Sequence, residues 1–139
     1  MSIKTCWIKA LQLAIIFAIT FVSSKTQAEK VVETAEFRKC MNDVDLGAFK
    51  NTQWGACYEA ELGRQNKRLE QEFKKLQSGY KGVDKKLLDA AKKSWLTYRE
   101  KWCRYEESLP IAPTPYVNYR ACLVDTTIEQ INKIKKIQP

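Results

Sequence analysis

Four cysteines are the residues of this chain with the clearest capacity for chemistry. They are Cys40, Cys57, Cys103 and Cys122, and a fifth cysteine, Cys6, lies near the N-terminus. We expect no metal site, because the chain contains no histidine and its cysteines lack the Cys-x-x-Cys spacing of zinc and thioredoxin-like sites. If Cys6 is removed with an N-terminal export signal, four cysteines remain. An even number of cysteines in a small exported domain favours two disulfide bonds.

The lack of histidine also argues against catalysis. Histidine is the most common general acid or base in enzymes, and serine or cysteine nucleophiles need such a partner. Two carboxylates can act as a glycosidase pair, but no motif here places a specific pair in a cleft. We therefore expect a protein that has no catalytic residues and no cofactor.

The N-terminus has the pattern of a secretory signal peptide. Lys4 and Lys9 precede an apolar stretch at residues 10–22, and small and polar residues then lead to Ala28. The apolar stretch is shorter than the about 20 residues of a membrane-spanning helix, so an uncleaved anchor is the weaker alternative. We expect residues 1–28 to be removed, leaving residues 29–139 as one periplasmic or secreted domain that does not span the membrane.

Removal of the signal peptide changes the charge. It takes away three lysines and no acidic residue, which lowers the formal net charge from +8 to +5. Basic and acidic residues are mixed along the remainder, and an exported protein does not meet nucleic acid, so nucleic-acid binding is not expected. The best candidate for a basic patch is formed by Lys133, Lys135 and Lys136, although such a cluster also simply suits a helix C-terminus.

The elements that would position these residues are predicted to be helices. A short helix is expected near residues 33–41, followed by a turn at Asp43, Asp45 and Gly47. A long helix then begins at about residue 51 and ends with Gly79 as its cap. Its apolar face has helical spacing and consists of Tyr58, Leu62, Leu69, Phe73 and Leu76.

A second long helix is expected to begin with Asp84 as its N-cap residue. Arg99 on this helix is expected to pair with a carboxylate such as Glu61 or Glu100, or to cap backbone carbonyls, rather than to bind a ligand. The helix carries a seam with unbroken three- and four-residue spacing: Leu88, Ala91, Trp95, Tyr98, Trp102 and Tyr105. We interpret this seam as core that packs against the preceding helix, because a short connection makes the two antiparallel.

Prolines interrupt the chain after this second helix. Thr114 and Pro115 then have the residue types of an N-cap and a first helical position, and a third helix is expected to end near Ile137. Its inward-facing residues are predicted to be Leu123, Ile128, Ile131 and Ile134. The predicted fold is all-α, a long antiparallel helical hairpin with a third packed helix, stapled by disulfides.

The hairpin limits how the cysteines can pair. Cys57 and Cys103 lie at similar distances from its turn and therefore near its open end. We prefer Cys40–Cys57 with Cys103–Cys122, because each bond closes a short loop beside a helix end and stabilises the fold by about 3 kcal/mol. Four cysteines allow three pairings, and Cys57–Cys103 with Cys40–Cys122 remains open.

The second long helix resembles the signature of the LprI-like family, which is named after a bacterial lysozyme inhibitor. The family pattern Ala-Gln-x-x-Trp-x-x-Tyr-Arg-Asp-x-x-Cys is matched at Ala91, Trp95, Tyr98, Arg99 and Cys103. The resemblance covers residues 40–135 and implies an inhibitor of lysozyme or of another cell-wall hydrolase. Further similar positions are Cys40, Cys57, Leu69, Phe73, Cys122 and Thr127.

Several polar positions of the family pattern differ in this chain. Lys92 replaces the family glutamine, Asn66 an aspartate, Glu70 an asparagine and Gln130 an arginine. The proline-rich residues 109–115 replace a glycine-rich stretch. Where such positions mediate binding, these differences imply a different target for this chain.

The proline-rich loop, residues 109–117, is the best candidate for a contact surface. It is rigid and carries Leu109, Ile111 and Tyr116, and a rigid apolar loop loses little entropy when it binds a protein. A simple linker between two helices is the alternative.

Two functions fit these observations. One is inhibition of a cell-wall hydrolase, and the other is a non-inhibitory envelope or scaffold module that binds anionic polymers or proteins. A strongly basic animal-type lysozyme would be repelled at long range by a positively charged partner, so the net charge favours a less basic hydrolase unless a local acidic patch offsets it. Salt distinguishes the two functions, because charge-driven polymer binding fades with ionic strength.

Overall fold

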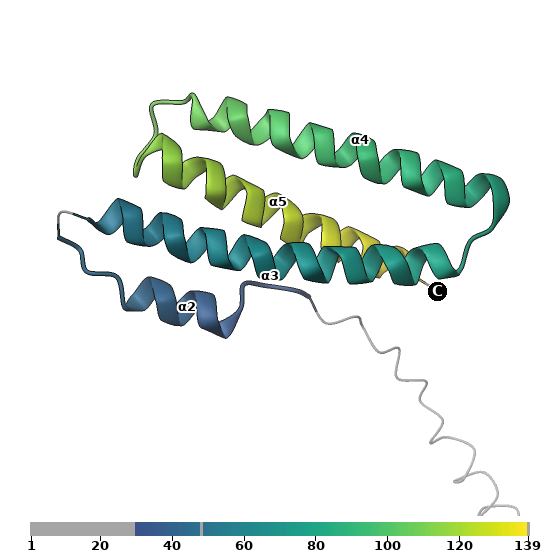
Figure 1. Cartoon of the computed structure of the whole chain (residues 1–139), viewed down its shortest axis with the longest axis horizontal. Helices are drawn as coiled ribbons and strands as arrows, with labels where there is room; N and C mark the ends of the chain where they lie inside the picture. The colour runs from purple at the N-terminus through teal and green to yellow at the C-terminus, as the bar shows by residue number, and fades with distance from the viewer. Residues whose placement is uncertain (1–29, 48, 139) are drawn as a thin grey trace, which may run out of the picture.

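The computed structural model describes residues 30–47 and 49–138, and the predicted signal peptide lies outside these residues. Helices are the regular elements of the described part, which contains no strand. They are α2 (Ala35–Asn42), α3 (Lys50–Ser78), α4 (Gly82–Glu107) and α5 (Pro115–Ile137), as shown in Figure 1. The all-α prediction is confirmed.

Threonine side chains cap two of the helices. Thr34 accepts a hydrogen bond from the backbone N–H of Phe37, so α2 begins after it, two residues later than expected. Thr114 accepts from the N–H of Val117 and Pro115 is the first residue of α5, as predicted. These short polar side chains satisfy backbone donors that the first helical turn leaves without partners.

The turn between α3 and α4 differs in one detail from the prediction. Gly79 caps α3 as expected, and Gly82 adopts a positive φ of 58°, which a residue without Cβ tolerates. The prediction of Asp84 as N-cap is wrong, because α4 begins at Gly82 with Lys81 at the cap position. Asp84 lies instead in the first turn, where its carboxylate suits the helix dipole.

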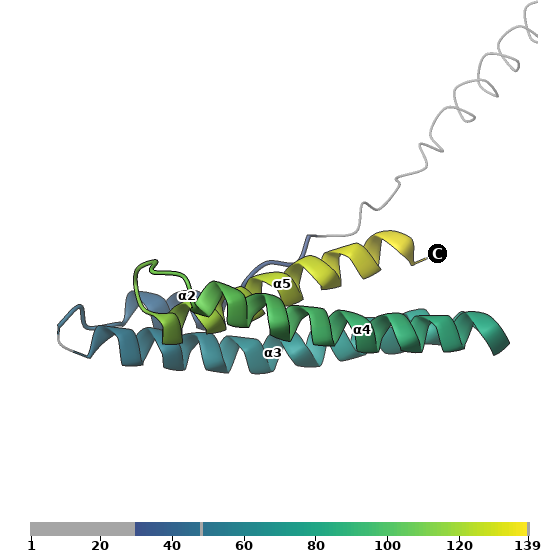
Figure 2. The ribbon, with the colours of Figure 1, turned by 90° about the horizontal axis from the view of Figure 1, so that it is seen from above.

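The long helices form a hairpin crossed by a third helix. α3 and α4 run antiparallel (Figure 1). α5 begins near the end of α4, runs in the same direction as α3 and passes obliquely behind α3. Figure 2 shows α5 leaving the plane of α3 and α4 toward its C-terminal end. The most extensive contacts join α5 to α3, then α5 to α4, and α2 lies beside α3. The predicted hairpin with a third packed helix is confirmed, with α5 as the shared packing partner.

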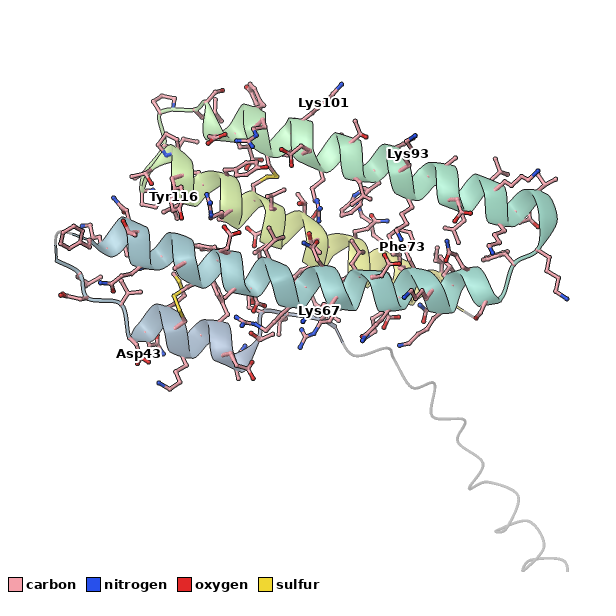
Figure 3. The ribbon with its side chains drawn as sticks, viewed as in Figure 1. Asp43, Lys67, Phe73, Lys93, Lys101 and Tyr116 are labelled. Atoms are coloured by element: carbon pink, nitrogen blue, oxygen red, sulfur yellow. A yellow bond between two sulfur atoms is a disulfide. The ribbon has the colours of Figure 1, made fainter. Side chains whose placement is uncertain are left out.

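The main hydrophobic core lies between α3 and α5. Leu69, Phe73 and Leu76 of α3 pack against Ile131 and Ile134 of α5. Figure 3 shows Phe73 between the helices, whereas Lys93 and Lys101 of α4 point away from the other helices. Full burial of each such apolar side chain stabilises the fold by about 1.5–3 kcal/mol. These positions face inward as predicted, while Ile128 is only half-buried.

The prediction that the α4 seam is buried core is wrong for most of its residues. Cys103 is the one fully buried residue of α4, while Tyr98, Trp102 and Tyr105 are 55%, 42% and 56% exposed, and Ala91 is exposed as well. Leu88 and Trp95 are half-buried against the main core. The helical spacing correctly places the aromatic rings on one face, but α5 crosses obliquely and leaves that face open.

Polar side chains add to the apolar contacts of Leu88 and Trp95 in joining α4 to α3. Lys92 forms an ion pair with Glu70, with 2.6 Å between Nζ and Oε2. Asp89 accepts a hydrogen bond from Gln77 nearer the turn. The hairpin partners therefore meet through a few apolar side chains and side-chain hydrogen bonds, and both make their most extensive contacts with α5.

The two disulfides pair as preferred. Cys40–Cys57 joins α2 to α3 with 5.8 Å between the Cα atoms, and Cys103–Cys122 joins α4 to α5 with 5.5 Å. Both bonds are visible in Figure 3. The alternative pairing is excluded, because α2 folds back along α3 and brings Cys40 beside Cys57.

A buried carboxylate attaches the N-terminal arm to α3. Glu61 accepts hydrogen bonds from the backbone and hydroxyl of Thr34 and from Gln65, and it pairs with Arg64. Burial opposes ionisation of Glu61, but these hydrogen bonds outweigh it and lower the pKa of the carboxyl. Three residues before Thr34, the backbone of Val31 also holds the arm, because its N–H and C=O form two hydrogen bonds with the side-chain amide of Asn132 in α5.

The described part of the chain has no helix of the length and apolarity that crossing a bilayer requires.

Candidate functional site

The most prominent surface feature is a row of aromatic side chains on α4, which we call the aromatic ladder: Tyr98, Trp102 and Tyr105. The rings of Tyr98 and Trp102 lie 6.2 Å apart at an interplanar angle of 21°, and those of Trp102 and Tyr105 lie 5.7 Å apart at 48°. Contiguous exposed aromatic surface marks interaction sites on soluble proteins. The ladder, which was predicted to be core, therefore replaces the proline-rich loop as the leading candidate site.

The ladder borders a groove between α4 and α5. One part of the groove has a volume of about 430 Å³ and extends from Trp102 toward the proline-rich loop. A second part of about 300 Å³ extends from Trp102 toward Trp95 and Lys133. Both parts are lined by Trp102, Glu106, Cys122 and Asp125, so they form one continuous groove.

The Cys103–Cys122 disulfide supports this groove. Cys122 is part of its lining, and the bond holds α4 and α5 together directly beside it. Because the ladder residues stand on a helix fixed by this cross-link, little backbone freedom is lost when a partner binds.

The proline-rich loop contributes only part of its predicted contact surface. Leu109 and Ile111 line the groove, and Ile111 is 57% exposed. Tyr116 instead lies against Gly55 of α3, beneath the guanidinium of Arg120 at 3.7 Å from the ring centre. Of the three predicted contact residues, Leu109 and Ile111 therefore line the groove, whereas Tyr116 packs α5 onto α3.

Acidic side chains surround the groove. Glu106 of α4 and Asp125 and Glu129 of α5 all line it, and the indole N–H of Trp102 donates a hydrogen bond to Glu106. Asp125 is exposed, but the neighbouring helices limit hydration of its carboxylate, and this desolvation, together with the nearby charges of Glu33, Glu129 and Glu106, raises the pKa of Asp125 to about 6. The groove lining therefore carries three carboxylates and one lysine, Lys133, although the chain as a whole is basic.

Arg99 has a different role from the predicted carboxylate pair. It donates hydrogen bonds to Asn66 of α3 at 3.0 Å and to Thr127 of α5 at 2.6 Å, and its guanidinium lies 5.0 Å from the Trp95 ring centre. Desolvation in this position lowers the pKa of Arg99. The predicted partner Glu61 pairs with Arg64 on its own helix. Arg99 instead ties the three long helices together.

The lysines of the predicted basic cluster on α5 do not all line the same pocket. Lys133 lies at one end of the groove. Lys135 lines a separate pocket of about 270 Å³ beside the N-terminal arm, together with Lys30 and Arg68. Lys136 is exposed on the last turn of the helix.

The groove residues supply groups that can bind a ligand. Aromatic faces stack on planar or cationic groups, and carboxylates accept charge-assisted hydrogen bonds. No group of metal-ligating side chains occurs among the described residues. Together these side chains can hold a cationic or planar ligand.

Sequence reasoning missed the three groove carboxylates. One signal was present, because Asp125 and Glu129 stand four residues apart and such like-charged pairs on one helix face are unfavourable. An unfavourable pair of this kind indicates a role other than helix stability.

Comparison with known proteins identifies the family. No curated protein and no solved structure matches this chain. The family model described as lysozyme inhibitor LprI matches residues 48–134, which include α3, α4 and most of α5. The chain therefore belongs to the LprI family.

Proposed function

We propose that this protein is an exported binding protein that inhibits lysozyme or another cell-wall hydrolase, and that the aromatic ladder contacts the enzyme. The exposure of Tyr98, Trp102 and Tyr105 is the observation that carries this proposal. Tyrosine and tryptophan supply much of the binding energy at protein interfaces, because they bury a large area at a small entropic cost. Family membership supports the choice of target.

Two features support the proposal that the protein is exported. The disulfides and the family are consistent with an extracytoplasmic location, where cysteines oxidise and stay oxidised. We propose cleavage after Ala28 and release into the periplasm or the medium. The mass of the protein recovered from a periplasmic extract tests this, and a product that retains residues 1–28 would contradict it.

An inhibition assay tests the proposed activity. The protein, exported to the periplasm of a bacterial host and purified in oxidised form, is titrated against several peptidoglycan hydrolases while lysis of cell walls is followed. We expect stoichiometric inhibition of at least one hydrolase class at about 0.15 M salt. Absence of inhibition across the panel would reject the proposed function.

A variant and a matched control locate the contact surface. Trp102→Ala is expected to weaken inhibition about 30-fold, which is the effect of losing one interface hot spot. Leu87→Ala on the same helix is the control, because Leu87 is 63% exposed and lies outside the groove. Equal effects of the two substitutions would show that the ladder is not the contact surface.

The alternative function is a non-inhibitory envelope module that binds anionic polymers. The pocket lined by Lys30, Arg68 and Lys135 favours it, because basic residues from three segments of the chain line the same pocket. Binding to purified anionic wall polymer that disappears as salt rises, without inhibition of any hydrolase, would support this function instead.

A further inference from the structure

We infer that the groove between α4 and α5 binds a lysine or arginine side chain on a basic segment of the partner protein. This inference rests on the proposed function and names the chemistry of the partner. It reverses the expectation from net charge, which favoured a less basic target.

The geometry of the groove matches a cation at the end of a long side chain. Trp102, Glu106 and Asp125 line both parts of the groove, and Glu129 and Lys133 line the second part. A guanidinium or ammonium group can stack on an aromatic ring while carboxylates accept its hydrogen bonds. The apolar side chains of Leu109 and Ile111 continue the groove and can cover the aliphatic stem.

The groove carboxylates differ from the other acidic residues of the long helices. Most of those residues are neutralised within the protein: Glu59 by Arg120, Glu61 by Arg64, Glu70 by Lys92, Glu72 by Lys75, and Glu100 and Glu107 by Arg104. None of the ion pairs within residues 30–47 and 49–138 includes Glu106, Asp125 or Glu129.

Mutual repulsion among these carboxylates provides a driving force for binding. The pKa of Asp125 is raised to about 6, because its carboxylate is incompletely hydrated and lies near Glu33, Glu129 and Glu106. A bound cation would relieve the same repulsion, whereas an anionic polymer would increase it. A neutral saccharide would stack on the rings and leave the repulsion in place, so charge complementarity selects a basic protein segment.

Binding of an oligo-arginine peptide tests the groove independently of any hydrolase. The protein is isotope-labelled, and the indole N–H signal of Trp102 is followed by NMR during titration with the peptide at about 0.15 M salt. We expect this signal to shift, together with the backbone amides of Asp125 and Glu129. Shifts confined to other surfaces, or a response to wall saccharide fragments but not to the peptide, would overturn the inference.

Two charge-matched double variants separate local recognition from long-range attraction. Asp125→Asn with Glu129→Gln removes two groove carboxylates, and Glu36→Gln with Asp84→Asn removes two carboxylates from the first turns of α2 and α4. Both pairs raise the net charge equally. We expect about a tenfold loss of peptide affinity for the groove pair and less than about a twofold loss for the control. Equal losses would overturn the inference.

The same variants distinguish failure of the inference from failure of the proposed function. Peptide binding in the groove without inhibition of any hydrolase would reject the function and retain the cation site. Inhibition of a hydrolase by the groove variant at the wild-type level would reject the cation site and retain the function. Weakened inhibition of a strongly basic lysozyme by the groove variant alone would support both.

Acidification provides a second readout. Lowering the pH from about 7.5 to about 5 protonates Asp125 and should weaken peptide binding. The charged groups facing this carboxylate are Glu33, Glu106 and Glu129, with Lys133 at the end of the groove. The groove double variant should lose this pH dependence, and retention of the full dependence would contradict the inference.

Discussion

Substitution of Gly55 by alanine is expected to destabilise the protein through a single contact. A Cβ added at Gly55 would lie 1.9 Å from Cε1 of Tyr116 and 2.8 Å from two further ring atoms. Atoms cannot approach so closely, so the ring must leave its position on α3. Because Tyr116 is 44% exposed, it can swing outward without unfolding the helix.

The expected magnitude combines a cost with a gain. Displacing a packed side chain costs about 1–3 kcal/mol, and loss of the Arg120 guanidinium from the Tyr116 ring adds about 0.5–1 kcal/mol. Alanine in place of glycine within a helix stabilises it by about 1 kcal/mol. The free energy of unfolding should therefore fall by about 1–2 kcal/mol.

Urea unfolding followed by far-UV circular dichroism measures this change. Gly63→Ala is the matched control, because Gly63 lies in the same helix and a Cβ there meets no atom within 4 Å. The control should raise the free energy of unfolding by about 1 kcal/mol. In a Tyr116→Ala background, Gly55→Ala should change sign and become stabilising by a similar amount.

Two results would refute this reasoning. If Gly55→Ala stabilises the protein as much as Gly63→Ala does, Tyr116 does not occupy the surface of α3 in solution. If Gly55→Ala remains equally destabilising in the Tyr116→Ala background, the cost has a source other than this ring.

Three further predictions concern stability. Cys103→Ser should lower the free energy of unfolding by about 3 kcal/mol by opening the bond to Cys122, and an unchanged urea midpoint would contradict this. Asp125→Asn should raise the free energy of unfolding by about 1 kcal/mol at neutral pH and change it little near pH 4. The reason is that the pKa of Asp125 is raised, so the wild-type carboxylate destabilises the fold as pH rises through about 6, although solvent screening reduces this effect. Glu61→Gln should cost about 1–3 kcal/mol above about pH 5, and less in acid because the lowered pKa of Glu61 stabilises only the ionised form. This variant should also release the arm at Thr34 to limited proteolysis, and equal cleavage of wild type and variant would contradict the role of Glu61.

Local signals in the sequence predicted the helices and their ends well. The residue pair Thr114 and Pro115 marks the start of α5, and Gly79 marks the end of α3, because caps and prolines act on backbone groups only a few residues away. The preferred cysteine pairing also followed from short loops beside helix ends. Cap positions without a side-chain hydrogen bond were less predictable, and Asp84 was misassigned for that reason.

The sequence by itself determined which side chains share a face, and the tertiary structure decided which faces are covered. Helical spacing aligns Tyr98 with Trp102, but the oblique path of α5 leaves this face exposed. The same crossing brings Glu106 beside Asp125. The physical reason is that periodicity arises within one helix, whereas burial and charge neighbours depend on how helices distant in sequence cross, and that angle is a property of the whole packed core.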